Sequence, residues 1–262
     1  MICMRLPVIV LLFFSCFLTT ALFSQKAKAN EKFFAYDSGW NLVGDIDKAT
    51  FFSRIQKVND TCWVVNNYNM FGPMISKEVY KDEDNKIAHG TWIFYKPNGY
   101  MDSICTFRNN LAHGSWYFTN DTNRVYLQKK FENGRLKEVI DFIKRDSVNK
   151  AKGNTESTGE LTDVQSESEF PGGGSAWARY LNKNFRYPER AIKSRLQGEV
   201  GIQFIVNLDG KVEDVEVYKS VEYSLDDEAR RLIDISPRWT PAIKDGKKIK
   251  TYKRQPVVFR IP

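Results

Sequence analysis

Histidine and cysteine are scarce in this sequence. Its 262 residues include only 2 histidines and 4 cysteines. One hypothesis is a paired metal site at His89 and His113. Both residues, however, begin equivalent copies of a repeated segment, so we interpret each His-Gly pair as a turn. No cysteine spacing completes a metal site, and neither a metal nor a cofactor is predicted. No nucleophile or carboxylate pair has a recognisable catalytic setting, so an enzyme is not predicted.

Dense clusters of one charge are also rare. The chain has 39 basic and 32 acidic residues, a net charge of +7, and the basic residues are dispersed rather than gathered into an arm. Nucleic-acid binding is therefore not predicted. The densest basic run, residues 244–254, holds six basic residues against one acidic. Such a run is typical of a solvated loop, and it also suits an acidic partner or anionic head groups.

Charge is absent from a stretch near the N-terminus. Arg5 is followed by nineteen uncharged residues, Leu6 to Ser24, and then by Lys26. Because about 20 apolar residues cross a bilayer, residues 1–25 are predicted to be a signal peptide or a membrane anchor. Lipid attachment at Cys16 is a third alternative. All three alternatives place the rest of the chain outside the cytoplasm.

Two cysteines remain after this segment, Cys62 and Cys105. In an oxidising compartment they can pair as a disulfide, or they can stay as two buried thiols in strands. Their separation in the sequence leaves both alternatives open.

Residues 30–143 contain an internal repeat. His89 to Phe94 recurs as His113 to Phe118, and Phe107 to Asn110 recurs as Phe131 to Gly134. Each unit has the pattern strand, turn, strand, with Asn-Gly pairs at turns. We therefore predict an all-β antiparallel sheet of repeated hairpins. The units resemble MORN-type repeats over residues 71–138, and three or more stacked units are expected.

Residues 144–168 differ in character from the repeat. They are polar, have few apolar side chains and show no periodicity. Such a segment buries too little surface to offset its chain entropy, so a flexible linker is predicted.

Residues 169–262 alternate helical and strand patterns. Val200, Ile202, Phe204 and Val206 alternate with less apolar neighbours, which indicates a strand with one buried face, and a turn and return strand follow over 208–218. Helices are expected after Ser175, after the Tyr187-Pro188 pair and from Ser224, with serine as the expected cap of the first and last. A final strand is predicted over 251–261, and Pro256 suggests an edge or a bulge.

Eight short motifs occur in one order along this region. They are Phe170-Pro171-Gly172-Gly173, Tyr187-Pro188, Gly198-Glu199-Val200, Asp209-Gly210-Lys211-Val212, Leu225-Asp226-Asp227-Glu228-Ala229, Pro237-Arg238-Trp239-Thr240-Pro241-Ala242, Gly246-Lys247 and Pro256-Val257-Val258-Phe259. In order and spacing they resemble the C-terminal domain of TonB, the bacterial energy transducer. The resemblance covers residues 169–262 and implies an α+β fold with helices packed on a small antiparallel sheet.

In that family the domain grips a segment of an outer-membrane receptor by strand addition. Carried over to this sequence, the resemblance implies partner-binding residues in the final strand and beside it: Val257, Val258, Phe259, Arg260, Arg186, Tyr187 and Pro188. The alternative is that Tyr187-Pro188 shapes a turn while Val257 and Phe259 fill the core.

The function implied is that of a TonB-like protein in the periplasm or cell envelope of a Gram-negative bacterium. Its partner would be a TonB-dependent receptor, and inner-membrane motor proteins are further partners of the family. Energy coupling is less directly supported, because residues 1–24 hold no histidine or acidic residue and residues 144–169 hold no proline. An exported scaffold or adaptor that binds without energy input is therefore the alternative.

Overall fold

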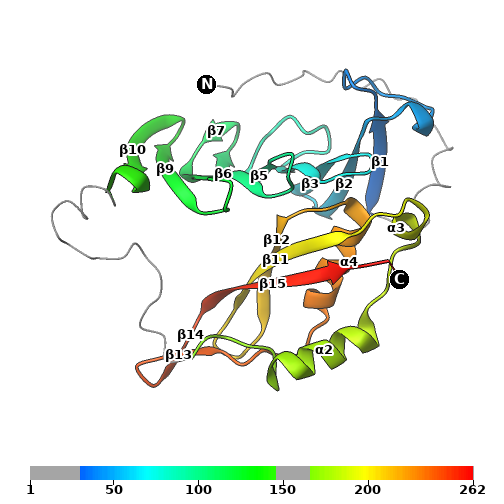
Figure 1. Ribbon diagram of the computed structural model, residues 1–262. Coiled ribbons are helices and arrows are strands. Elements are labelled where there is room, and N and C mark those ends of the chain that lie inside the picture. The colour runs from blue at the N-terminus through cyan, green and yellow to red at the C-terminus, as the bar shows by residue number, and fades with distance from the viewer. Residues whose placement is uncertain (1–29, 146–165, 262) are drawn as a thin grey trace.

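The computed structural model describes residues 30–145 and 166–261, and these form two parts that lie against each other (Figure 1). A large antiparallel sheet precedes a smaller sheet packed with helices, which confirms the predicted α+β class. The export segment predicted over residues 1–25 lies outside the described residues, as do residues 146–165 of the predicted linker. Among the helices that are described, none is both long and apolar enough to span a bilayer.

The N-terminal half is a 10-stranded sheet in which sequential strands are neighbours from β1 to β10, with the short β7 paired only to β6. Its strands are β1 Glu31–Tyr36, β2 Phe51–Asn59, β3 Cys62–Asn69, β4 Met74–Tyr80, β5 Gly90–Tyr95, β6 Met101–Arg108, β7 Leu111–Ala112, β8 Gly114–Thr119, β9 Val125–Glu132 and β10 Arg135–Asp141, with a short 3-10 helix, η1, at Ile46–Lys48.

The repeat in the sequence follows from a row of aromatic rings that crosses these strands. The indole N–H groups of Trp92 and Trp116 donate to the carbonyls of Val79 and Thr106 on the preceding strand, each at 2.9 Å. The ring centroids along the row lie 4.7 to 5.2 Å from those of their neighbours, in the order Tyr80, Trp92, Phe107, Trp116, Phe131. Each hairpin therefore packs on the next, as stacked repeats require.

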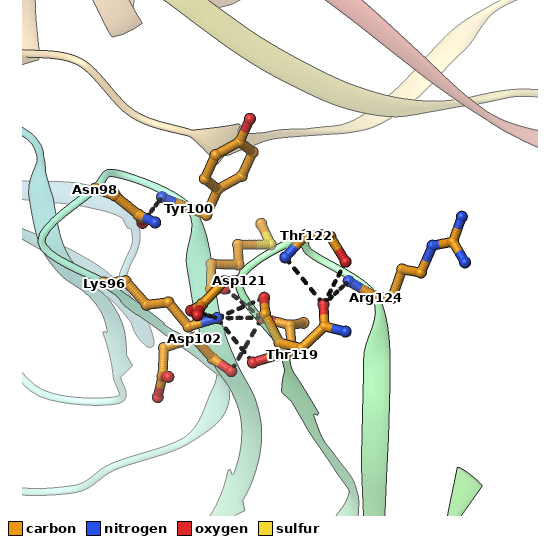
Figure 2. A network of polar contacts seen from close by, with 10 residues as sticks. Lys96, Asn98, Tyr100, Asp102, Thr119, Asp121, Thr122 and Arg124 are labelled. Carbon is orange, nitrogen blue, oxygen red and sulfur yellow. Dashed lines mark hydrogen bonds and ion pairs between the residues drawn. The ribbon is translucent and has the colours of Figure 1, made fainter. Parts of the chain in front are cut away.

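The hairpin turns are tied to one another at one end of the sheet. Lys96, in the β5–β6 turn, donates to the carbonyls of Thr119 and Asn120 at 2.8 and 2.6 Å (Figure 2). The side chain of Asn120 in turn accepts from the backbone N–H groups of Thr122 and Arg124. These bonds satisfy carbonyls at the turn and fix the geometry of adjacent repeats.

The two cysteines do not pair with each other. Cys62 begins β3 and Cys105 lies in β6, so β4 and β5 separate them. Three strand spacings amount to about 14 Å, whereas disulfide-linked Cα atoms lie within roughly 7 Å. The disulfide alternative is therefore wrong, and Cys105 is a buried residue of the sheet.

The C-terminal half consists of α2 Gly173–Asn184, α3 Glu189–Lys193, β11 Gly198–Val206, β12 Val212–Lys219, α4 Tyr223–Asp234, β13 Ala242–Lys244, β14 Lys247–Ile249 and β15 Thr251–Phe259. The order of its main sheet is β12-β11-β15. The predicted inward residues of β11 are all fully buried, as is the apolar stripe of α4: Val200, Ile202, Phe204, Val206, Leu225, Ala229, Leu232 and Ile233. The alternating apolar residues of β11 and the helically spaced apolar residues of α4 therefore pack into one shared core.

Neither predicted serine cap was correct. Helix α2 begins after Gly172, whose φ of 84° lies in the left-handed region that favours glycine, and Ser175 falls inside the first turn. Helix α4 is capped by Glu222, whose carboxylate accepts from the backbone N–H of Ser224 at 2.8 Å.

The two halves meet where β12 ends and α4 begins. The backbone N–H of Ser220 donates to the carbonyl of Gly99 at 2.8 Å, and the hydroxyl of Ser220 accepts from the backbone N–H of Met74 at 2.7 Å. Farther along β12, the hydroxyl of Tyr95 donates to the carbonyl of Val217 at 2.7 Å. Strands and a turn of the N-terminal sheet therefore complete hydrogen bonds at the C-terminal end of β12 and at the residue after it.

Buried charges cross the same contact. Arg54 in β2 pairs with Asp227 in α4 at 2.8 Å and with Glu31 in β1 at 2.7 Å. On the other side, Arg190 in α3 pairs with Glu222 at 2.6 Å and also donates to the carbonyl of Met70 in the N-terminal half. Both arginines are buried, so each depends on groups that only the docked arrangement supplies.

We expect Gly99→Ala to separate or destabilise the two halves. A Cβ at this position would lie 2.0 Å from the carbonyl oxygen of Ser220, and the φ of Gly99 is +84°. Both features oppose alanine, so the free energy of unfolding should fall by more than about 1 kcal/mol. Urea unfolding of the purified chain measures it. Gly246→Ala is the matched control, because its φ is also positive at +70° but no atom lies within 4 Å of the added Cβ. Equal losses in both variants would show that the close approach to Ser220 contributes nothing.

Asp226 makes stability depend on pH. It is 1% exposed at the contact between the halves, and burial raises the pKa of its carboxyl to about 7 from an ordinary value of 3.8. Between these values the folded protein keeps the proton and the unfolded chain loses it. The free energy of unfolding therefore falls as pH rises from about 4 to 7, by up to about 1.4 kcal/mol per pH unit. Asp226→Asn should gain stability relative to the natural chain between pH 5 and pH 8 in urea unfolding. Identical pH profiles would contradict this.

Candidate functional site

The two edges of the small sheet differ in what covers them. The outer side of β12 is occupied by the N-terminal half at the C-terminal end of the strand, through the bridge between Lys219 and Tyr100 and the hydrogen bond from Tyr95 to Val217. On the opposite edge, within residues 30–145 and 166–261, no other segment pairs with the outer side of β15. Figure 1 shows β15 at the near edge of the sheet, away from the large sheet.

Other edges of the structure are partly covered, short or irregular. Next to β1, the backbone N–H of Val43 donates to the carbonyl of Ala35 at 2.9 Å. Beside β13, Ser166 and Ile243 exchange two backbone hydrogen bonds. Strand β10 is open, but its register shifts between Leu136 and Glu138. A bulge and an intervening lysine are features that discourage strand addition. Strand β15 is thus the long, regular open edge of the described chain.

Pro256 defines which groups of β15 point outward. The strand pairs with β11 over nine residues without a register shift, so Pro256 sits in a regular ladder rather than a bulge. A proline fits there only if its nitrogen points away from the sheet. Residues of the same parity, Tyr252, Arg254 and Val258, then direct their N–H and C=O groups outward, and Pro256 adds one further carbonyl. These are the groups that an added strand would complete.

The four predicted residues at the end of β15 alternate between the buried face and the exposed face of the sheet. Val257 and Phe259 are 0% and 1% exposed and belong to the core, whereas Val258 is 46% exposed. Arg260 follows the strand and is exposed. Two of the four are therefore core residues that position the edge, and Val258 and Arg260 are accessible to a partner.

The Arg186-Tyr187-Pro188 segment lies at the C-terminal end of β15. The ring of Tyr187 contacts that of Phe259 with a centroid distance of 5.8 Å, and its hydroxyl donates to the carbonyl of Leu196 at 2.7 Å. Burial raises the pKa of that hydroxyl. Pro188 is buried at the start of α3, and the exposed Arg186 is held through its backbone by Glu228. This segment supports Phe259 from one side, with Arg186 exposed to solvent and Tyr187 half-buried.

Two outward residues of β15 lie in the basic run of residues 244–254 but were not predicted to line the edge that binds a partner strand. Tyr252 is 74% exposed, and Arg254 lies over the ring of Tyr218 at 4.9 Å. A pocket of about 260 Å³ adjoins them, lined by Glu167, Ser168, Ala242 and residues 251–254. Counting alternate residues back from Pro256 would have found both side chains in the sequence. The pocket depends on Glu167 and Ser168, which fall in the predicted linker.

Residues 183–261 match the family model for the C-terminal domain of the Gram-negative bacterial TonB protein. The match runs from the last turn of α2 to the end of β15, and so covers the whole β12-β11-β15 sheet. It confirms the resemblance over these residues. No curated protein matches the chain. The resemblance of residues 71–138 to MORN-type repeats stays a prediction.

We expect the two faces of β15 to respond differently to truncation. Phe259→Ala should lower the free energy of unfolding by about 3–5 kcal/mol, because it empties a buried site between Phe185 and Tyr187. Val258→Ala should change it by less than about 0.5 kcal/mol, because half of that side chain is already in solvent. Thermal and urea unfolding measure both. Similar losses would show that Val258 is a core residue.

Proposed function

We propose that this protein works in the cell envelope of a Gram-negative bacterium, where it binds a segment of an outer-membrane receptor by strand addition at β15. The binding serves energy-dependent transport across the membrane. The observation that carries the proposal is the open, regular edge of β15 within the region that matches the TonB C-terminal family.

Strand addition suits the chemistry of this edge. Three outward N–H groups and four outward carbonyls, from Tyr252, Arg254, Pro256 and Val258, lie along this edge. One of them, the carbonyl of Pro256, accepts a long hydrogen bond of 3.4 Å from the exposed side chain of Gln255, which a partner strand can displace. Each backbone hydrogen bond contributes a net stabilisation of roughly 0.5–1.5 kcal/mol, and alternate side chains provide selectivity. The core below the edge is fully buried, so the strand presents a rigid template. The function proposed here is binding without catalysis.

A scaffold or adaptor that binds without energy input is the second candidate. The observation that favours it is the docked N-terminal sheet, which is held to the C-terminal half by Arg54 and Arg190. Both candidates use the β15 edge, so peptide binding alone does not separate them. Collapse of the proton gradient does, because it abolishes the action of a transducer and leaves adaptor binding intact. Sequencing the N-terminus of the membrane and soluble fractions shows whether an anchor is retained.

Val258→Pro tests strand addition directly. The substitution removes one outward N–H and leaves the hydrogen bonds to β11 in place, by the same parity that accommodates Pro256. Loss of one backbone hydrogen bond should weaken binding of a receptor-derived peptide by roughly 3- to 10-fold. Fluorescence anisotropy with a labelled peptide gives the dissociation constant.

Val258→Thr is the matched variant, because it changes the side chain and keeps the amide. It should lose less affinity than Val258→Pro, and both variants should unfold within about 1 kcal/mol of the natural chain. If the two variants bind equally well, the backbone of β15 does not form the bond that strand addition requires.

A further inference from the structure

Strand β10 ends the large sheet, and none of its 7 residues is buried. Within residues 30–145 and 166–261, no segment pairs with its outer side. Leu136 and Val139 are 52% and 51% exposed there. Stacked hairpins cover their apolar faces with the next hairpin, so the last hairpin of a row needs a cap. The row of aromatic rings ends at the half-buried Phe131, so β10 is the place where such a cap would lie.

The bulge in β10 decides which of its residues share a face of the sheet. Partners in an antiparallel pair lie on the same face. Leu136 pairs with Phe131 and Val139 pairs with Lys129, and these two residues of β9 are two positions apart. Leu136 and Val139 therefore lie on one face, although residues three positions apart lie on opposite faces of a regular strand.

The extra residue of the bulge is Lys137. It lies beside Glu138, and the two residues together oppose Lys130 of β9. Because Lys130 belongs to the other face of β9, this charged pair lies on the face opposite to Leu136 and Val139. Each face of β10 thus carries one pair of residues, one apolar and one of opposite charges.

A second copy of β10 fits this irregular edge. If two copies run antiparallel about a two-fold axis between Lys137 and Glu138, each of these residues faces the other in the second copy. Leu136 of each copy then faces Val139 of the other, and every pair joins residues of the same face. A register shifted by one residue would bring two Lys137 or two Glu138 together and set Leu136 against the wrong face. The bulge that discourages a regular strand is therefore matched by its own copy.

The charges at the centre of this arrangement are available to a second copy. Lys137 and Glu138 are both exposed. Lys137 pairs with Glu132 of its own chain at 3.0 Å, but both side chains are more than half exposed, and such a pair contributes little. A hollow of about 570 Å³, lined in part by Phe131, Lys137 and Glu138, adjoins them and leaves room for the side chains of the other copy.

We propose that β10 is an interface between two copies of this chain, which join their large sheets edge to edge about a two-fold axis. An interface of this kind must be complementary to itself, and the apolar pair and the charged pair of β10 both meet that condition. A surface of one sign, such as an anionic membrane, would meet adjacent charges that cancel. Because β10 and β15 lie in different sheets, the inference does not depend on strand addition at β15.

Sedimentation equilibrium of the purified full chain over a concentration series measures the association. We expect the weight-average mass to rise toward twice the 30.4 kDa of one chain. Lys137→Glu and Glu138→Lys each bring like charges together twice in the dimer. Each variant alone should therefore weaken the association constant at least about 10-fold.

Mixing the two variants tests the two-fold register. In a mixed dimer the glutamate introduced at position 137 meets the lysine introduced at position 138, and the natural Glu138 of one chain meets the natural Lys137 of the other. An equimolar mixture of Lys137→Glu and Glu138→Lys should therefore associate about as tightly as the natural chain. Recovery in the mixture also shows that both variants are folded.

Lys193→Glu is the control, because it makes the same change in net charge as Lys137→Glu at an exposed residue of α3 in the other half. It should associate as the natural chain does, and an equal loss in this variant would assign the effect to net charge and overturn the proposal. A natural chain that stays monomeric would also overturn it. So would single variants that associate as tightly as the natural chain, or a mixture that does not recover.

Discussion

Arg54 and Arg190 are buried charges whose partners come from both halves of the chain. Arg54 meets Asp227 across the contact, and Arg190 reaches the carbonyl of Met70. A buried arginine that loses its partner costs roughly 3–5 kcal/mol, so neither half keeps these groups satisfied by itself. The close approach of Gly99 to Ser220 adds a steric requirement at the same place. The placement of the two halves relative to each other depends on this contact.

The contact between the two halves determines which edge of the small sheet is accessible to a partner. The sheet order β12-β11-β15 puts its two edge strands on opposite sides. The N-terminal half completes the outer groups at the C-terminal end of β12, whereas no described segment pairs with the outer side of β15, which lies away from the large sheet (Figure 1). One edge thus holds the chain together, and the other is left to a partner.

Local patterns predicted local structure well. Alternation at Val200 to Val206 placed β11, and the recurrence of Trp92 at Trp116 identified the stacked hairpins. The predicted edge position of Pro256 was also correct. The caps were wrong for different reasons: α2 begins after the left-handed Gly172, and α4 is capped by Glu222, which Arg190 holds in place. The capping bond spans two residues, but the ion pair that holds Glu222 comes from a residue thirty-two positions away, which no local pattern records.

The sequence by itself determined the elements, the repeat and the open strand, since faces and turns depend on residues a few positions apart. The alternation of residues in β15 can also be read from the sequence, and counting from Pro256 identifies Tyr252 and Arg254 as outward residues. Only the tertiary structure decided that β12 is covered, that Cys62 and Cys105 lie too far apart to bond, and that Val257 and Phe259 are core. Those outcomes depend on contacts between distant residues, such as Gly99 with Ser220, whose pairing no periodicity records.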